Sequence, residues 1–235
     1  MVKSTPDVKT IVLRKNIDEI ESMDMVNQKK TSPFKSLLSR PKQEDVHVHS
    51  LKLYYECSLM VSGKYIADYF RKANHSISVD SNVHEISLGG GIFPIRTKSS
   101  ITKAFVGKRG KNKIDLKLEE HVFVEEENKL TFDHHGHEIK FPFKINSKTV
   151  ENYPKRLLEQ NSANVKKLEM TYDAAIEKLQ SELKKPLEDD VRNLNEEFTL
   201  REITEVYVPI FEARLIGPKK KVGIIRLDAV RKKIL

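Results

Sequence analysis

Residues 205–230, EVYVPIFEARLIGPKKKVGIIRLDAV, carry the clearest fold signal in the chain. Positions 206–216 are mostly β-branched, aromatic or aliphatic, which is typical of a β-strand. Gly217 and Pro218 then interrupt the run, because glycine tolerates unusual backbone angles and proline fixes φ near a turn value. Strand-like residues resume at 222–230, so we predict a C-terminal β-hairpin. Pro209 has no N–H to donate, which places it at a sheet edge or in a bulge.

Residues 53–71 show the same order of features as the C-terminal stretch. A strand-like run leads to Ser62-Gly63-Lys64, and a second strand-like run follows. We therefore predict a second hairpin that turns at Gly63. The likeness suggests two related β-modules, although any two hairpins share these features.

Length and composition limit the class of protein. With 235 residues, 38% of them hydrophobic and 32% charged, the chain is long enough for one large or two small domains with a packed core. No apolar run approaches the roughly 18 residues of a membrane span, and no apolar leader opens the sequence. The single cysteine, Cys57, excludes an internal disulfide and is interpreted as a small buried hydrophobe. We predict a cytoplasmic protein with no membrane partner.

Charge is distributed unevenly along the chain. Residues 51–118 carry 12 basic and 5 acidic side chains, and residues 206–235 carry 8 and 2. The intervening residues 165–205 carry 7 basic and 11 acidic side chains. The predicted hairpins are therefore the basic parts of the chain, and the predicted helices are acidic.

The order of elements predicts an α+β fold with antiparallel β-sheet built from hairpins. Along the chain, two helices lie between an N-terminal β-rich part and a C-terminal hairpin. We expect residues 1–45 to form a partly flexible N-terminal arm, in which Asn16 caps a short helix. Residues 46–150 then form a β-rich domain. Residues 151–235 form a helix–helix–hairpin module, which can pack with the β-rich part as one unit. Its two helices are predicted to begin at Thr171 and at Pro186, which favour helix starts.

The segment 32–41 places Phe34, Leu37 and Leu38 on one side of a single helical turn between two prolines. Such a turn can dock on a partner, but we favour docking on the chain's own domain.

Three histidines between residues 132 and 138 raise the possibility of a metal site. His134, His135 and His137 lie close to two carboxylates, and such residue types can hold a transition metal. The same residues lie between two predicted strands, and Asp-x-x-Gly is common turn chemistry. We favour a turn over a catalytic centre, and we expect no cofactor.

Two basic loops are candidate anion contacts. Residues 106–114 contain Gly-Lys-Arg-Gly, which resembles the phosphate-clamping loop of KH domains, but a strand-like pattern follows where a KH domain needs a helix. We interpret this stretch as a basic hairpin loop that can still contact phosphates. The candidate contacts from both loops are Lys108, Arg109, Lys111, Lys113, Lys219, Lys220 and Lys221.

Residues 165–235 also resemble a PepSY-like module. The likeness rests on TYDAAIEKL from Thr171, VYVPIFEA from Val206 and IRLDAV from Ile225. In that family a short helix with a central alanine precedes a hairpin whose second strand ends in an Asp-Ala turn. The resemblance implies a small binding or inhibitory module rather than an enzyme.

These observations predict a non-catalytic binding module that holds an anionic partner, either nucleic acid or an acidic protein surface, through basic β-hairpin loops. Clustered Lys and Arg supply most of the non-specific affinity for phosphates. One alternative is a PepSY-like interaction adaptor that does not bind nucleic acid. Another is a metal-dependent enzyme that uses His134, His135 and His137.

Overall fold

A computed structural model of the chain describes residues 7–35, 41–80, 82–95, 112–184 and 190–235. The elements follow in the order β1 (Val8–Val12), α1 (Glu19–Lys29), η1 (Ser32–Phe34), η2 (Gln43–Asp45), β2 (His47–Val79), β3 (Glu85–Leu88), β4 (Gly91–Pro94), β5 (Asn112–Phe132), α3 (Pro154–Gln160), η3 (Ser162–Asn164), β6 (Val165–Lys166), α4 (Tyr172–Leu183), β7 (Arg192–Ile216), η4 (Pro218–Lys220), β8 (Val222–Asp228) and β9 (Lys233–Ile234).

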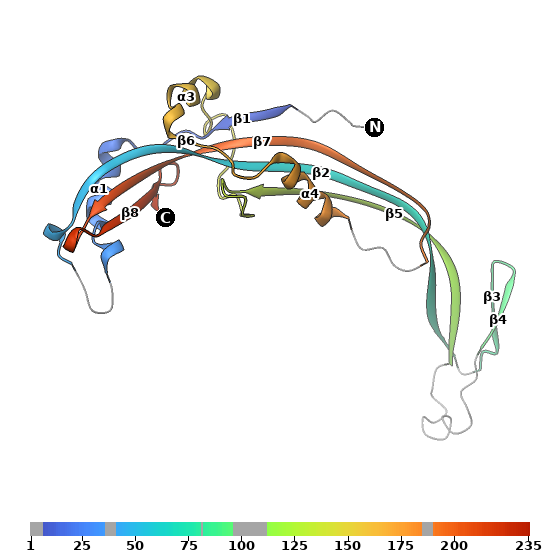
Figure 1. The fold of residues 1–235 in the computed structure, drawn as a ribbon. Coiled ribbons are helices and arrows are strands. Elements are labelled where there is room, and N and C mark those ends of the chain that lie inside the picture. The colour runs from blue at the N-terminus through green and yellow to red at the C-terminus, as the bar shows by residue number, and fades with distance from the viewer. Residues whose placement is uncertain (1–6, 36–40, 81, 96–111, 185–189) are drawn as a thin grey trace. The chain divides into compact units, whose positions relative to one another are not determined.

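Seven strands form one sheet, and Figure 1 shows β7, β2 and β5 as neighbours within it. The strand order is β5-β2-β7-β8-β9, with β1 paired to β7 and β6 paired to β2. The pairings of β1 and β6 are parallel, but the sheet is mostly antiparallel. Strands β3 and β4 form a separate antiparallel pair. The predicted α+β class is confirmed.

The second predicted hairpin is absent, because β2 continues through Gly63 as one strand of 33 residues. The glycine serves packing rather than a turn. The ring of Phe198 on β7 approaches so closely that a methyl group at position 63 would lie 3.0 Å from its Cε2 atom. The expectation of two related hairpin modules therefore has no counterpart at residues 62–64.

The helices agree with the sequence only in part. Helix α4 begins after Thr171, whose hydroxyl accepts a hydrogen bond from the N–H of Ala174, as predicted. The second predicted helix is wrong over residues 192–198, which belong to β7, and its predicted start at Pro186 lies outside the described residues. Helix α1 is capped by Asp18 rather than Asn16, and the Asn16 amide instead donates to the carbonyl of Val230.

Contacts divide the chain into two compact units that differ from the predicted segments. Unit 1 comprises Met1–Lys64, Glu127–Lys184 and Phe198–Leu235, and unit 2 comprises Tyr65–Glu126 and Lys185–Glu197. Strand β1, which lies within the predicted N-terminal arm, is part of the sheet and buries Val12. The described part of that arm therefore contributes to the core of unit 1.

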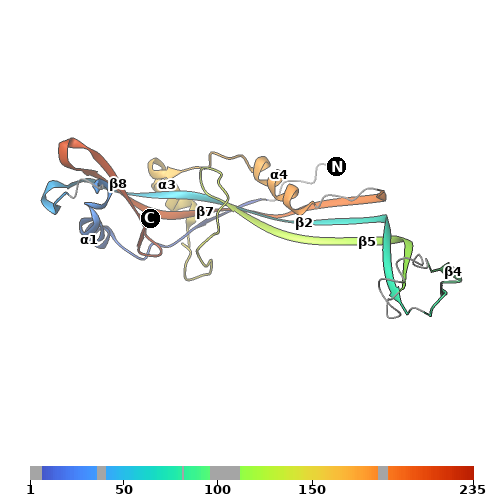
Figure 2. The same cartoon turned by 90° about the horizontal axis from the view of Figure 1, so that it is seen from below.

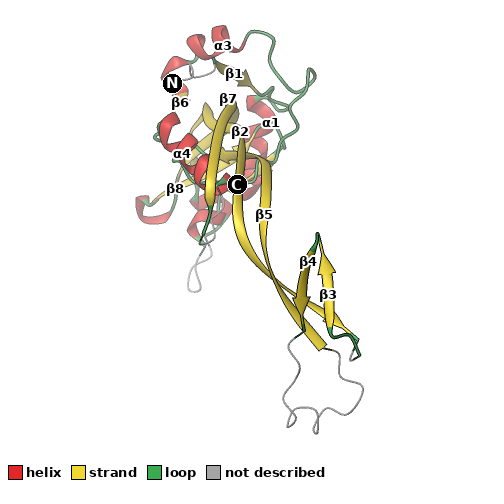
Figure 3. Ribbon diagram, turned by 90° about the vertical axis from the view of Figure 1, so that its right-hand side faces the viewer, coloured by secondary structure: helices red, strands yellow, loops and turns green. Residues whose placement is uncertain are grey.

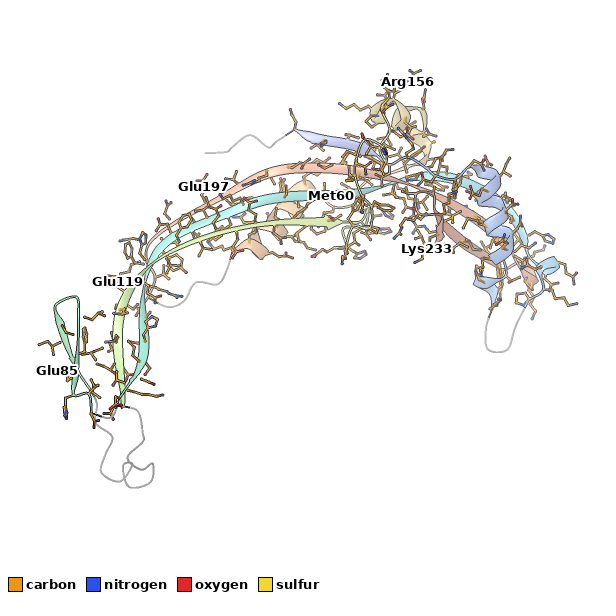
Figure 4. All side chains as sticks on the ribbon, turned by 180° about the vertical axis from the view of Figure 1, so that it is seen from behind. Met60, Glu85, Glu119, Arg156, Glu197 and Lys233 are labelled. Carbon is orange, nitrogen blue, oxygen red and sulfur yellow. The ribbon has the colours of Figure 1, made fainter. Side chains whose placement is uncertain are left out.

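Unit 1 packs helices onto its strands, as Figure 2 shows for α1 beside β8. Helix α1 places Val26 against Ala213 and Ile225 of the β7–β8 pair. A second cluster surrounds Met60, which Figure 4 labels on β2, and includes Leu13 and Val208. Side chains from both ends of the chain thus meet on one set of strands.

The described residues of unit 2 contain strands and no helix (Figure 3). Ile114 and Leu116 of β5 are buried with Ile95, and Phe93 of β4 packs against this cluster. Polar pairs join β2 to β5. Glu120 accepts hydrogen bonds from Arg71 at 2.8 Å and His75 at 2.6 Å, and the His121 ring stacks on Phe70.

Candidate binding surface at the β7–β8 hairpin

Strands β7 and β8 form an antiparallel hairpin whose two faces differ. The register pairs Ile210 with Asp228 at one end and Ile216 with Val222 at the other. Successive side chains alternate between faces, so the odd-numbered positions share one face and the even-numbered positions share the other. Ala213, Leu215 and Ile225 on the odd-numbered face are buried beneath α1 and Val46.

Phe34 completes the cover of the odd-numbered face. Its ring lies against Gly217 and Gly223, where an added methyl group would meet ring carbons at 2.7 and 2.6 Å. These distances are below the closest approach of two carbon atoms, so both positions require glycine for this ring placement. Phe34 therefore docks on the chain's own domain as predicted, whereas Leu37 and Leu38 lie outside the described residues.

The even-numbered face carries exposed aliphatic side chains near the turn. Val222 is 71% exposed, Ile224 is 52% exposed, and Ile216 opposite Val222 is 37% exposed. Arg214 opposite Ile224 is also largely exposed. A contiguous group of exposed apolar residues with a polar rim is a feature of interaction surfaces.

The turn itself presents three lysines to solvent. Lys219, Lys220 and Lys221 are all exposed, and the backbone N–H of Gly217 closes the turn by donating to the carbonyl of Lys221 at 2.8 Å. Lys219 has φ of 57° and Lys220 has φ of 59°. L-residues other than Asn and Asp rarely adopt this left-handed region, at a cost of roughly 1–2 kcal/mol each. Lysine thus occupies two positions where glycine would be less strained.

Ion pairing separates these lysines from three cations in and after β8. Arg226 pairs with Glu56, Arg231 lies 2.5 Å from Asp228, and Lys232 lies 2.9 Å from Glu21. Within the described parts of the chain, Lys219, Lys220 and Lys221 have no carboxylate within ion-pair distance. Their charge is therefore available to an external anion.

Deeper along the even-numbered face, a charge network connects four strands. The Glu56 carboxylate of β2 accepts from Lys166 at 2.8 Å and from Arg226, and Lys166 also lies 3.6 Å from Glu212. Burial opposes ionisation of Glu56, but the Lys166 and Arg226 contacts outweigh it and lower its pKa. The network links β2, β6, β7 and β8, and among the described residues the buried Nε atom of Arg226 has no hydrogen-bond partner.

The histidine-containing turn is present as predicted, and its three rings have different carboxylate partners. The Asp133 carboxylate accepts from the N–H groups of His135 and His137, and Gly136 has φ of 85°. His134 lies 3.9 Å from Glu56, His135 lies 3.0 Å from Glu169, and His137 lies 3.4 Å from Asp133. No set of three His, Cys, Asp or Glu side chains in the described residues is arranged to hold a metal ion.

The strand expected immediately after this turn is absent. Residues 139–148 form no strand, and Glu138 makes only an isolated bridge to Phe132. The turn therefore ends β5 rather than joining two long strands.

A cavity of about 710 Å³ lies at the start of α4. In its lining, the Glu205 carboxylate accepts hydrogen bonds from Tyr172 at 2.6 Å and from Tyr207 at 3.0 Å. Burial raises the pKa of both phenols, and the nearby Glu205 carboxylate acts in the same direction. Burial, followed by the charge of Glu205, raises the pKa of the adjacent Cys57 thiol to about 12, so this thiol stays protonated at neutral pH.

The other predicted basic loop is only partly described. Lys108, Arg109 and Lys111 lie outside the described residues. Lys113 is exposed on β5 in unit 2, whereas Lys219, Lys220 and Lys221 belong to unit 1. Among the candidate contacts that the structure describes, the three lysines of the C-terminal turn share one turn of unit 1.

Our sequence interpretation missed the apolar half of this surface. Val222 and Ile224 are two positions apart in a strand and therefore lie on the same face, whereas the buried Ile225 lies on the other face. The signal was hidden because aliphatic residues in a strand are usually assigned to the core.

Comparison with protein-family models, with curated protein sequences and with solved structures gave no match for this chain. The PepSY-like resemblance therefore remains a prediction. The helices formed by the described residues lack the combination of length and apolar character that crossing a lipid bilayer requires.

Proposed function

We propose that the protein is a non-catalytic binding module that holds an anionic partner at the β7–β8 turn. The observation that carries this proposal is the exposure of Lys219, Lys220 and Lys221 without a carboxylate partner in the described residues. Three adjacent cations in one turn supply the clustered positive charge that anion binding needs. We also propose that the protein is cytoplasmic and has no membrane partner.

The strain in the turn supports a binding role. Residues held at unfavourable backbone angles cluster at functional sites, where the surrounding structure over-determines them. Lys219 and Lys220 both have positive φ, and the turn is fixed by the hydrogen bond from Gly217 to Lys221. The lysines are therefore presented at defined positions rather than on a mobile tail.

The chemistry of the described residues favours binding over catalysis. The only cysteine is buried and its pKa is raised to about 12, which is unsuitable for a nucleophile at neutral pH. The Glu56 and Glu205 carboxylates each accept two hydrogen bonds from partners within the protein. The proposal therefore assigns no reaction to these groups.

The test is fluorescence anisotropy with labelled single-stranded DNA, double-stranded DNA and polyglutamate, each over a salt series. A variant with Lys219→Glu, Lys220→Glu and Lys221→Glu is compared with Lys140→Glu, Lys144→Glu and Lys148→Glu. The second variant reverses three exposed charges outside the hairpin and has the same net charge.

We expect the native protein to bind at least one probe and the hairpin variant to lose that binding, while the control retains most of it. For DNA, three lost contacts reduce the slope of log K against log salt by about 2 to 3. Absence of binding to every probe at low salt, or equal losses in both variants, would overturn the proposed function.

A further inference from the structure

We infer that the partner contributes an extended acidic peptide segment, which adds as a strand to the open edge of β8 at residues 222–225. This inference rests on the proposed function, because the lysines of the turn supply the charge that selects the segment. It goes further by naming the partner as a peptide and by assigning backbone groups to its recognition.

The register identifies which backbone groups of β8 face outward. Gly217 N–H donates to the Lys221 carbonyl, and Ala229 N–H donates to the Pro209 carbonyl. Hydrogen-bonded pairs alternate with non-bonded pairs in an antiparallel ladder, so odd-numbered residues of β8 bond to β7. The N–H and C=O groups of Val222, Ile224 and Arg226 consequently point away from β7.

Strand β9 covers only one end of this outer edge. It pairs with Leu227 and Asp228, and the N–H of Leu235 donates to the Arg226 carbonyl at 2.9 Å. Figure 4 labels Lys233 in this short strand. In the described parts of the chain, no strand pairs with Val222 or Ile224 on this side. Two residues therefore offer an unpaired donor and acceptor each.

Residues 222–225 of the open edge include no proline and no charged side chain. Natural edge strands are protected by proline, by bulges or by a charged side chain within the strand. Residues 222–225 are Val, Gly, Ile and Ile, and the aliphatic side chains at 222 and 224 are largely exposed. An added strand gains main-chain hydrogen bonds and buries these two side chains, which is the energetic basis of β-augmentation.

Geometry and charge distinguish the possible occupants of this edge. Antiparallel pairing of two copies centred on Ile224 would bring Lys221 of each copy to Leu227 of the other, where β9 already pairs with the outer edge. This overlap with β9 disfavours a second copy. Nucleic acid has no peptide groups for the ladder, and the exposed side chains are aliphatic rather than the aromatic platforms on which bases stack. An acidic peptide satisfies the backbone, apolar and charge requirements together.

The probe is a labelled ten-residue peptide of alternating Glu and Val. One control peptide has the same charge with two central Val residues replaced by Pro, and another has Lys in place of Glu. Proline cannot donate to a ladder, so the first control keeps the charge but cannot form a strand. Labelled single-stranded DNA is measured in parallel.

The protein variant Ile224→Pro removes one outward N–H without removing a hydrogen bond to β7. Proline is tolerated at an edge position whose N–H faces solvent. Ile224→Thr is the matched control, because it keeps the N–H and suits a strand. Circular dichroism and thermal unfolding verify that both variants fold. Amide hydrogen exchange of Val222 and Ile224 in the native protein gives a readout that needs no variant.

We expect the Glu-Val peptide to bind, to slow exchange at Val222 and Ile224, and to lose about tenfold in affinity to Ile224→Pro but not to Ile224→Thr. The Pro-containing and Lys-containing peptides should bind at least tenfold more weakly.

Equal binding of the Glu-Val and Pro-containing peptides would overturn strand addition while leaving the proposed anion binding intact. Strand addition by an acidic peptide would also be overturned if DNA bound and the Glu-Val peptide did not. It would likewise be overturned if sedimentation of the protein without peptide showed a dimer that Ile224→Pro abolishes. No binding of any anionic probe would overturn the proposed function as well.

Discussion

The ring of Phe34 lies on the backbone of Gly223, and a methyl group at position 223 would lie 2.6 Å from the Phe34 Cζ atom. This contact joins η1, near the start of the chain, to the last long hairpin. The Phe34 ring covers the odd-numbered face of β8. The exposed aliphatic side chains lie on the opposite, even-numbered face. The candidate surface therefore depends on a glycine that contributes no side chain to it.

Replacing Gly223 with Ala should lower the free energy of unfolding by about 1–3 kcal/mol, because the methyl group overpacks against the Phe34 ring. In a Phe34→Ala background the same change should be neutral or stabilising by about 0.5–1 kcal/mol, since Ala is better than Gly in a strand interior. Urea unfolding of the four proteins in this double-mutant cycle measures the coupling. An equal effect in both backgrounds would remove Phe34 as the reason for the glycine.

Replacing Lys219 or Lys220 with Gly should stabilise the protein by about 0.5–1 kcal/mol, because glycine adopts positive φ without the strain of an L-side chain. The same substitutions should weaken anion binding, since each removes a charge from the turn. Lys221→Gly is the control, because Lys221 has φ of −63° and is not strained. Thermal unfolding and anisotropy are measured on the same samples. A gain in stability at Lys221 equal to that at Lys219 would contradict the strain account.

Stability should fall between pH 7.5 and pH 5.5 in a way that depends on His134. Burial lowers the pKa of His134 from its usual 6.5, despite the opposing effects of Glu56 and Asp133. Because the folded-state pKa is lowered, the stability contributed by neutral His134 is fully present above pH 6.5. It is lost as the pH falls from 6.5 through the folded-state pKa. His134→Gln should flatten this pH dependence. Urea unfolding at three pH values makes the comparison, and an identical pH profile for the native protein and His134→Gln would exclude this role.

Tyr172→Phe and Tyr207→Phe should each cost about 1–3 kcal/mol of stability, because each leaves the half-buried Glu205 carboxylate with one donor fewer. Tyr153→Phe is the matched control, since Tyr153 is 74% exposed and should lose almost nothing. Guanidinium unfolding provides the free energies. Losses below those of Tyr153→Phe would show that the two hydrogen bonds are not stabilising.

Several parts of the fold could be predicted from the sequence because local chemistry determines them. Thr171 caps α4 and Gly217-Pro218 ends β7, and both effects depend on adjacent residues. Gly63 could not be assigned correctly, because its reason is the Phe198 ring on a strand 135 positions further along the chain. Residues 187–198 have apolar spacing that suits a helix, but pairing within the sheet makes 192–198 a strand.

The candidate surface was predictable in its charge but not in its geometry. Lys219, Lys220 and Lys221 stand out in the sequence as a basic turn between strands. The exposed aliphatic residues and the open edge depend on the register of β7 with β8 and on the short reach of β9, which are long-range properties. The histidine cluster illustrates the converse, since three neighbouring residues in sequence have three separate carboxylate partners in space.

The most direct test of the central claim is a titration of the isotope-labelled protein with its tightest-binding anionic probe, monitored through backbone amide chemical shifts. We predict that the largest changes fall at residues 214–226, with little change at the exposed lysine-containing segment 139–148. Changes centred on the histidine turn or the cavity at α4, or spread evenly over all exposed lysines, would contradict the assignment of the β7–β8 turn as the binding surface.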